Sequence, residues 1–336
     1  AKETVPDTVN VVSRKTRFTF GKDYSIPKPF DPRLIAVVPP AVAKAAMESG
    51  IAKEPIANWK KYEESLLERL GSDNKLVRLL HNRAKLEPKS VVFTEADQLV
   101  VLKAAQIVYD EGIAKPILLG RRDKIEKLKE EIEFDAEVPI IDPKSDAEGD
   151  RKDAYAKIYW GQRKRRGITL HSARKLMRER NYFAAMMVNE GDADALISGY
   201  SRNYPSVVKP MLELIGLDKG ASRIATTNVL MTERGPLFLS DTSINIDPTA
   251  KDLAKIAQMT ATTVNMFGIE PIIAMISYSN FCSSVNDKAS KVRDAVKYLQ
   301  RYFPSVIVDG ELQTDFALNK KMRMDRFPFS KLTNKK

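Results

Sequence analysis

The chain has 336 residues, of which 43% are hydrophobic, so it can bury a large core, and at this length we expect two lobes rather than one. Its formal net charge of +11 suggests a polyanionic partner, although charge alone does not distinguish nucleic acid from a phosphorylated small molecule. The single cysteine, Cys282, excludes an internal disulfide, and with only His81 and His171 a structural metal site is disfavoured.

The N-terminal region is expected to be an extended connection. The sequence AKETVPDTVN lacks the basic and apolar regions of a secretion signal, and no apolar run approaches the roughly 20 residues of a membrane helix, so we expect a cytoplasmic protein. Three prolines in KDYSIPKPFDPRLI disfavour a helix, and residues 1–35 therefore resemble an interdomain linker. Helical patterns follow at 40–50, 56–71 and 75–86.

Strands and helices begin to alternate near Lys89. Short β-branched runs, each followed by a helical pattern, predict strands at 91–93, 116–120, 138–141 and 194–198. The helix after the first of these strands carries one apolar face, formed by Leu102, Ala105, Val108 and Tyr109. Such alternation indicates a mostly parallel sheet with helices on its faces, in a first lobe that we expect to span residues 36–220.

A second lobe is expected over residues 221–336. It opens with an antiparallel pair of strands at 223–231 and 235–241. A helix follows, with Asp247 predicted as its N-cap and Pro248 as its first residue. Its apolar stripe predicts a core face that ends before Gly268, and the stripe consists of Leu253, Ile256, Ala257, Thr260, Val264 and Phe267.

The remaining elements of the second lobe continue the alternation. PIIAMIS (271–277) is expected to be a buried strand, and residues 289–303 a helix that ends at Pro304. SVIVDGE (305–311) is expected to be another strand, and the sheet is expected to continue to the end of the sequence.

Polar residues follow four of these expected strands. Ligands of parallel α/β sheets bind beyond the carboxyl ends of the strands, so repetition at four ends favours a site over isolated turn or capping roles. The first set also precedes a helix, whose free N–H groups favour an anion such as phosphate. The residues are Gly199, Ser201, Arg202 and Asn203; Asp241 and Ser243; Ser277, Tyr278 and Ser279; and Asp309, Glu311 and Asp315.

Other signatures are absent or ambiguous. The basic cluster QRKRRG (162–167) lacks the interleaved aromatic side chains of a nucleic-acid site and is more typical of a solvated helix end. No G-x-G-x-x-G, P-loop or G-x-S-x-G pattern occurs, so a dinucleotide fold, an NTPase and a serine hydrolase are unsupported. The residues alone therefore indicate an anion-binding α/β protein.

Longer segments add a family resemblance, which runs from about Leu86 to Phe316. It resembles the phosphate acetyltransferase and butyryltransferase family, and it implies an α/β fold in which two lobes of mostly parallel sheet, flanked by helices, surround a central cleft, as in phosphotransacetylase and isocitrate dehydrogenase. In that family the cleft holds coenzyme A and acyl phosphate. The segments are TEADQLVVLKAAQIVYDEGIAKPILLG, QRKRRGIT, NYFAAMMVNEGDADALISG, IIAMISYS and VDGELQTDFAL.

A narrower resemblance lies upstream of these segments. IPKPFDPRLIAVVPPAVAKAAMESGIAKEPI is similar to the junction between the malic enzyme domain and the phosphotransacetylase-like domain of large bacterial NAD(P)-dependent malic enzymes. The similarity implies that residues 1–35 are a linker and the tail of a malic enzyme domain outside this sequence. NAD(P) and a divalent metal would belong to that domain, and neither is expected in this chain.

The family resemblance also implies a set of ligand-binding residues. Arg163 matches the arginine of an R-K-x-x-G-I-T pattern, and Lys209 stands where active acyltransferases usually have arginine. Lysine offers a point charge without the bidentate fork. With the polar loops, the expected residues for acetyl-CoA, CoA or phosphate are Arg163, Gly199, Ser201, Arg202, Asn203, Lys209, Asp241, Ser277 and Tyr278.

Three departures from the family pattern predict that acyl transfer is lost. Tyr200, Arg202 and Tyr204 add bulk to a loop that is small in active members, and Val100 replaces an arginine. The sequence also stops at SKLTNKK, before the family's segment with the catalytic Ser, Arg and Asp. We therefore expect neither catalytic nor metal-binding residues in this chain.

The expected function is regulatory. The chain is interpreted as a domain that senses acetyl-CoA and assembles a homo-oligomer, a dimer or higher, in a parent that converts malate to pyruvate by oxidative decarboxylation. An active phosphate acetyltransferase and a purely structural oligomerisation module are the alternatives. Neither nucleic acid nor a membrane is an expected partner.

Overall fold

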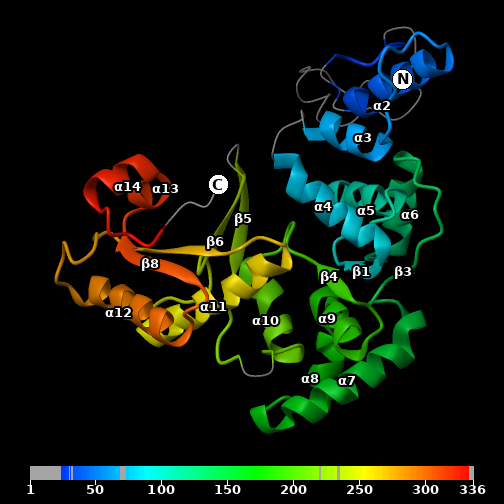
Figure 1. Cartoon of the computed structure of the whole chain (residues 1–336). Coiled ribbons are helices and arrows are strands. Elements are labelled where there is room, and N and C mark those ends of the chain that lie inside the picture. Colours follow the sequence, from blue (N-terminus) through cyan, green and yellow to red (C-terminus); the bar gives the residue numbers. More distant parts are fainter. Residues whose placement is uncertain are drawn as a thin grey trace. The chain divides into compact units, whose positions relative to one another are not determined.

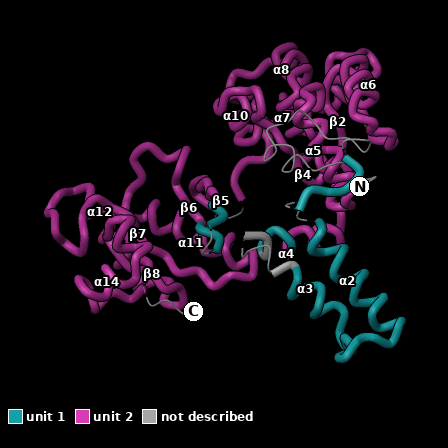
Figure 2. Tube along the Cα trace, turned by 90° about the horizontal axis from the view of Figure 1, so that it is seen from above, with its two compact units in different colours: residues 1–78, 229–237 teal, residues 79–228, 238–336 magenta. Residues whose placement is uncertain are grey.

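The computed structural model describes residues 24–29, 31, 33–68, 73–218, 221–232 and 235–332. The chain divides into two units, one of residues 1–78 with 229–237 and one of residues 79–228 with 238–336 (Figure 2). Most of the expected linker, residues 1–23, lies outside the described residues, and the predicted lobe boundaries remain predictions. Within the described part, no helix has the length and apolar character needed to cross a membrane.

The N-terminal helices are α2 (Arg33–Glu48), α3 (Trp59–Glu68) and α4 (Asp73–Leu86). The first helix was expected from residue 40, and that start is wrong because α2 begins at Arg33 and contains Pro39 and Pro40. The carboxylate of Asp31 accepts hydrogen bonds from the Arg33 N–H at 3.1 Å and from its guanidinium at 2.7 Å. This local cap fixes the start of α2 ahead of the two prolines.

The first sheet has the strand order β3-β2-β1-β4, and all its strand pairs are parallel. Strands and helices alternate along this part of the chain (Figure 1), and with the parallel pairing this confirms the predicted α/β class. The strands are β1 (Lys89–Phe93), β2 (Ala114–Leu119), β3 (Ile140–Ile141) and β4 (Ala195–Ile197). The helices are α5 (Leu99–Asp110), α6 (Arg122–Glu131), α7 (Gly149–Arg163), α8 (Leu170–Leu176), α9 (Arg180–Glu190) and α10 (Tyr204–Leu214), with short 3-10 helices η1 (Asp146–Glu148) and η2 (Lys164–Arg166).

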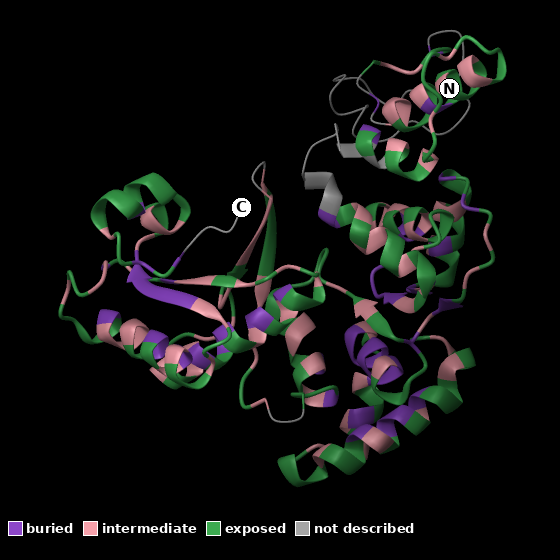
Figure 3. Ribbon diagram, in the orientation of Figure 1, coloured by how far each residue is buried: buried purple, intermediate pink, exposed green. Residues whose placement is uncertain are grey.

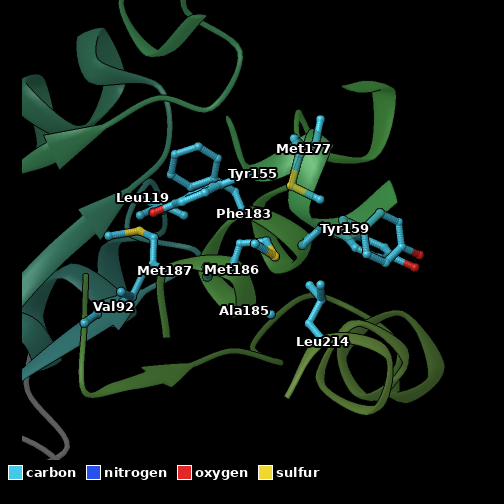
Figure 4. Close-up of a cluster of buried hydrophobic side chains, with 14 of the residues drawn as sticks. Val92, Leu119, Tyr155, Tyr159, Met177, Phe183, Ala185, Met186, Met187 and Leu214 are labelled. Carbon is cyan, nitrogen blue, oxygen red and sulfur yellow. The ribbon is translucent and has the colours of Figure 1, made fainter. Parts of the chain in front are cut away.

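Each face of this sheet has its own core. Neighbouring residues of a strand point to opposite faces, so Val92 joins one cluster while Phe93 joins the other. The Phe93 cluster is closed by α5 and α6. The Val92 cluster contains Tyr155 of α7 and Phe183 of α9, whose rings lie 5.3 Å apart (Figure 4). Residues 181–187 of α9 are all buried (Figure 3), so this helix is enclosed on every side.

The described residues after α10 form two small sheets and four further helices. Strands β5 (Thr227–Thr232) and β6 (Gly235–Ser240) pair with each other, and β7 (Ile272–Ile276) pairs in parallel with β8 (Ile307–Leu312). Helices α11 and α12 pack with the β7–β8 sheet around a common cluster that includes Ala257, Leu299 and Val308. The helices are α11 (Ala250–Met266), α12 (Asp287–Tyr302), α13 (Thr314–Leu318) and α14 (Lys320–Arg326).

Two expectations for this region are wrong. Strand β7 is only partly buried, whereas residues 308–312 of β8 are fully buried (Figure 3), because among the described residues β7 pairs with β8 alone and leaves Ile272 and Ile276 exposed. After β8 the chain continues as α13 and α14 rather than as a further strand.

The predicted cap of α11 is also wrong. Thr249, not Asp247, is the N-cap, and it forms a reciprocal capping box with Asp252. Asp247 instead pairs with Lys291, with 2.6 Å between carboxylate and ammonium. A threonine with an acidic residue three positions later satisfies two backbone donors at once, which the Asp247–Pro248 alternative cannot do.

Candidate functional site

The loop after β4 is wrapped around a carboxylate of the same chain. The backbone N–H groups of Gly199, Tyr200 and Ser201 donate to the Glu95 carboxylate at 3.0, 2.8 and 3.0 Å, and the Ser201 hydroxyl donates to it as well. Glu95 follows β1, which pairs directly with β4, so both segments reach the same edge of the sheet. The loop predicted as a phosphate cradle therefore holds Glu95 with three of its N–H donors.

These donors determine the charge state of Glu95. The residue is buried, and burial by itself raises the pKa of a carboxyl. The hydroxyl and N–H of Ser201, together with the N–H groups of Gly199 and Tyr200, outweigh this effect, so the pKa of Glu95 is lowered below its usual value. Glu95 is thus a fixed negative charge at the base of the loop.

The rest of the loop is fixed by an asparagine at each end. The Asn203 side chain caps α10 by accepting from the Ser206 N–H at 3.2 Å. At the other end, the Ser198 hydroxyl donates to the Asn181 side-chain oxygen at 2.8 Å, and the Asn181 amide donates to the Ser206 carbonyl at 3.1 Å. The path of residues 198–206 is therefore set by hydrogen bonds to α9 and within the loop.

A cavity of about 260 Å³ beside this loop is lined by three cationic side chains and by the carboxylates of Glu95 and Glu179. Arg180 forms a bidentate pair with Asp97, at 2.7 and 2.8 Å, which accounts for its charge. Arg202 and Lys209 also line the cavity, and within the described residues neither has a hydrogen-bond or ion-pair partner for its side chain. Their positive charge is available to a ligand.

A larger cavity of about 510 Å³ shares Lys209 with the first. Its basic residues also include Arg163 and Arg166, while Ser243 and Tyr204 add hydroxyl groups. Glu213 and four apolar side chains complete the wall, and the apolar residues are Pro205, Val208, Leu212 and Ile244. A cavity with several cations and an apolar wall can hold a molecule that has phosphate groups and an uncharged chain.

Arg163 is anchored at the C-terminal end of α10. Its guanidinium donates to the Glu213 carbonyl at 2.6 and 3.1 Å. The Glu213 carboxylate in turn accepts from the hydroxyls of Tyr159 and Tyr182 at 2.8 and 2.7 Å. Burial and the nearby Glu213 carboxylate raise the pKa of Tyr159 to about 12, so this hydroxyl remains a donor at neutral pH. These contacts join α7, α9 and α10 into one support for the larger cavity.

A second buried glutamate repeats the arrangement of Glu95 in the β7–β8 sheet. Glu311, on β8, accepts from the Cys282 N–H at 2.9 Å and the Ser279 hydroxyl at 3.0 Å, so it holds the loop after the parallel neighbour β7. Arg293 donates to it at 2.9 and 3.0 Å. Burial opposes its charge, but these donors lower the pKa of Glu311 to about 2. Ser279 and Glu311 are therefore committed to holding this loop.

The other predicted residues have separate positions. Asp241 accepts from the Asn245 side chain at 2.8 Å, and Tyr278 is 56% exposed. Neither these two nor Ser277 lines either cavity, whereas Arg163, Arg202 and Lys209 do. Asp309 is buried and accepts from the Ser330 hydroxyl at 2.9 Å.

Sequence reasoning missed Glu95, Asp97, Arg180 and Arg166 as members of the site. A usable signal existed for the first two, because TEAD places two carboxylates directly after a predicted strand. Arg166 lies in the basic cluster QRKRRG, where composition did not distinguish it from its neighbours, and Arg180 lies in a helical segment without a comparable signal. No cluster of three or more metal-ligating side chains occurs in the part of the chain that the structure describes.

Comparisons with known proteins agree with the motifs. The family described as phosphate acetyl/butaryl transferase matches residues 75–336. The NADP-dependent malic enzyme of Salmonella typhimurium (strain LT2) is 40% identical over 319 residues, which cover 94% of this chain but only 42% of that enzyme. The chain thus spans less than half the length of this relative.

Two further relatives are similar over most of their own length. The phosphate acetyltransferase of Thermoanaerobacterium thermosaccharolyticum is 34% identical over 262 residues, or 76% of this chain and 79% of that enzyme. The crystal structure of a phosphotransacetylase from Streptococcus pyogenes aligns with a TM-score of 0.69 and 32% identity, over 78% of this chain and 79% of that one. The resemblance predicted from the motifs is confirmed, and this chain belongs to the phosphate acetyl/butaryl transferase family.

Proposed function

We propose that this chain binds acetyl-CoA as a regulatory domain and does not transfer the acyl group. The observation that carries the proposal is the state of the loop after β4, where Glu95 occupies three N–H donors while Arg202 and Lys209 beside it have no partner within the described residues. The site thus keeps two cations that can bind a ligand, while three backbone N–H groups of the loop are already bonded to Glu95.

The two cavities supply what a coenzyme A ester requires. Its phosphates match the basic groups of Arg163, Arg166 and Lys209, and the apolar wall of the larger cavity suits its uncharged pantetheine arm. The volume of about 510 Å³ falls within the range of small-molecule sites, roughly 300–1,000 Å³.

Acyl transfer needs more than binding. Hydrogen-bond donors must point at the oxygen that becomes negative in the transition state. In the loop after β4 the N–H groups of Gly199, Tyr200 and Ser201 point at Glu95, and the charge of that carboxylate repels an acyl phosphate. A domain that binds acetyl-CoA without converting it can act as a sensor of acetyl-CoA.

The similarity to NADP-dependent malic enzymes supplies the context for such a sensor. In a parent of that kind, acetyl-CoA bound here would alter malate oxidation through subunit assembly, with a coupling of about 1–3 kcal/mol. NAD(P) and a divalent metal would be bound by the malic enzyme part, and this domain would contribute to a homo-oligomer.

Isothermal titration calorimetry of this chain with acetyl-CoA tests the binding. We expect saturable heat that is weakened roughly tenfold by Lys209→Ala or Arg166→Ala, because each removes a charge-assisted contact to phosphate. Arg165→Ala is the matched control, since Arg165 is adjacent to Arg166 but lines neither cavity. Absence of heat at millimolar acetyl-CoA, or equal weakening by Arg165→Ala, would contradict the proposed site.

The second candidate function is phosphate acetyltransferase activity, which is favoured by the 34% identity to the Thermoanaerobacterium enzyme. Acetyl phosphate and CoA are incubated with the chain, and thioester formation is followed by ultraviolet absorbance. Turnover that saturates with both substrates and is lost in Lys209→Ala would establish this activity and refute a purely regulatory role.

A further inference from the structure

A buried lysine on α7 lacks a negatively charged partner. Lys152 is 9% exposed, and its ammonium donates to the Ser145 carbonyl at 2.6 Å. Within the described residues no carboxylate pairs with it, so one carbonyl is the only group that satisfies an ammonium with three donors. Because burial of an unpaired charge is costly, an anion from outside the chain would complete this environment.

Lys152 lines a cavity of about 450 Å³ in which four of the seven lining residues are lysine or arginine. Lys175 and Arg178 also line it, and neither has an ion-pair partner in the described part of the chain. The carboxylate that lines the cavity, Asp153, is already bound by Lys157 at 2.8 Å and by Arg174 at 2.6 Å. The complete lining is Gly149, Lys152, Asp153, His171, Arg174, Lys175 and Arg178.

The lining indicates the class of ligand. Apart from the His171 ring it contains no aromatic or aliphatic side chain that could hold a nucleobase or an acyl chain. Gly149 and Lys152 lie in the first turn of α7, where the carboxylates of Glu148 and Asp150 offset the helix dipole, so the side chains of Lys152, Lys175 and Arg178 supply the positive charge. Arginine forks and lysine ammonium groups match the oxygens of linked phosphates.

We propose that this cavity on α7 and α8 binds a compact polyanion with two linked phosphate groups, with Lys152 as its buried anchor. None of its lining residues lines either cavity of the proposed acetyl-CoA site. The site therefore stands independently of the proposed function.

Inorganic diphosphate is the probe for the first experiment. Calorimetry and thermal unfolding of the full chain should show saturable binding of diphosphate, weaker binding of orthophosphate, and a melting temperature that rises with diphosphate concentration. In Lys152→Met, which keeps the length of the side chain, diphosphate affinity should fall at least about tenfold and the rise in melting temperature should disappear. Circular dichroism verifies that the variant is folded. The exposed Lys127→Met is the matched control and should retain the parent affinity.

A second pair of variants keeps the test decisive if Lys152→Met does not fold. Arg178→Glu should abolish diphosphate binding, whereas the exposed Arg165→Glu, with the same change in net charge, should not. Hydrogen exchange should show diphosphate-induced protection at residues 149–153 and 171–178. Equal losses in both charge-reversal variants, or protection confined to residues 199–209, would overturn the proposal.

Discussion

At the scale of single residues, two buried glutamates decide where the loops at the strand ends lie. Glu95 and Glu311 each receive N–H and hydroxyl donors from the loop that follows a parallel neighbouring strand. Glu311 is additionally neutralised by Arg293, whereas Glu95 has only uncharged donors. Both carboxylates therefore hold a loop, but only Glu311 is paired with a cation. The two should respond differently to substitution and to pH.

Glu95→Gln should destabilise the chain by about 1–3 kcal/mol, because the new amide group directs donors at the N–H groups of the loop and leaves them unsatisfied. Urea denaturation measures the loss, and faster hydrogen exchange at Gly199, Tyr200 and Ser201 locates it. The exposed Glu137→Gln is the control and should change the free energy of unfolding by less than about 0.5 kcal/mol. An equally small effect of Glu95→Gln would show that the carboxylate does not hold the loop.

Glu311 predicts an acid-dependent loss of stability. Its pKa falls from an ordinary value of 4.5 to about 2 on folding, so the unfolded chain binds the proton more readily than the folded one. The stabilisation is complete above about pH 4.5 and is lost as the pH falls towards 2. The free energy of unfolding, measured across this range, should decline less steeply in Glu311→Gln. Parallel pH profiles for parent and variant would rule out this contribution.

At the scale of elements, Thr249 rather than Asp247 should determine the stability of α11. Thr249→Ala removes the acceptor of the capping box and should cost about 1 kcal/mol, within a range of 0.5–2. Asp247→Ala removes only an ion pair whose carboxylate is 87% exposed and screened by solvent, and should cost clearly less than Thr249→Ala. Thermal or urea unfolding of the two variants measures the difference. The reverse order would restore Asp247 as the cap.

Local patterns predicted the strands better than the helix starts. Residues 91–93 lie in β1 and residues 116–119 in β2, because short apolar runs between helical segments are typical of buried parallel strands. The start of α2 was not predicted because it depends on the side chain of Asp31, which accepts hydrogen bonds from Arg33 ahead of Pro39 and Pro40.

The site was predictable only in part. Arg202 was found from its position after a predicted strand, whereas Lys209 was found only through the family resemblance. The contact of Glu95 with the same loop depends on β1 lying next to β4, an adjacency of strands far apart in the chain that no local pattern specifies. The contact of Arg163 with α10 could not be predicted either, because it also joins residues far apart in the chain.

At the scale of the whole molecule, ligand binding and stability are linked. If acetyl-CoA binds the folded chain alone, a hundredfold excess over its dissociation constant should raise the free energy of unfolding by about 2.7 kcal/mol. Urea denaturation with and without acetyl-CoA measures this increase, and Lys209→Ala at the same ligand concentration should show a smaller one. No increase at saturating ligand would contradict specific binding to the folded chain.

The hydrogen bonds of Glu95 join residues separated by 104 to 106 positions in the chain. Contacts of such long range close a large loop of chain and form after local helices and turns. During refolding, the loop after β4 should therefore acquire its shape after the local helices, and no earlier than the β1–β4 pair, which joins equally distant residues. In pulsed hydrogen exchange, the N–H groups of residues 199–201 should become protected later than those of α9, and simultaneous protection would refute this order. If the loop is completed last, a ligand can bind only after the scaffold around the loop has folded.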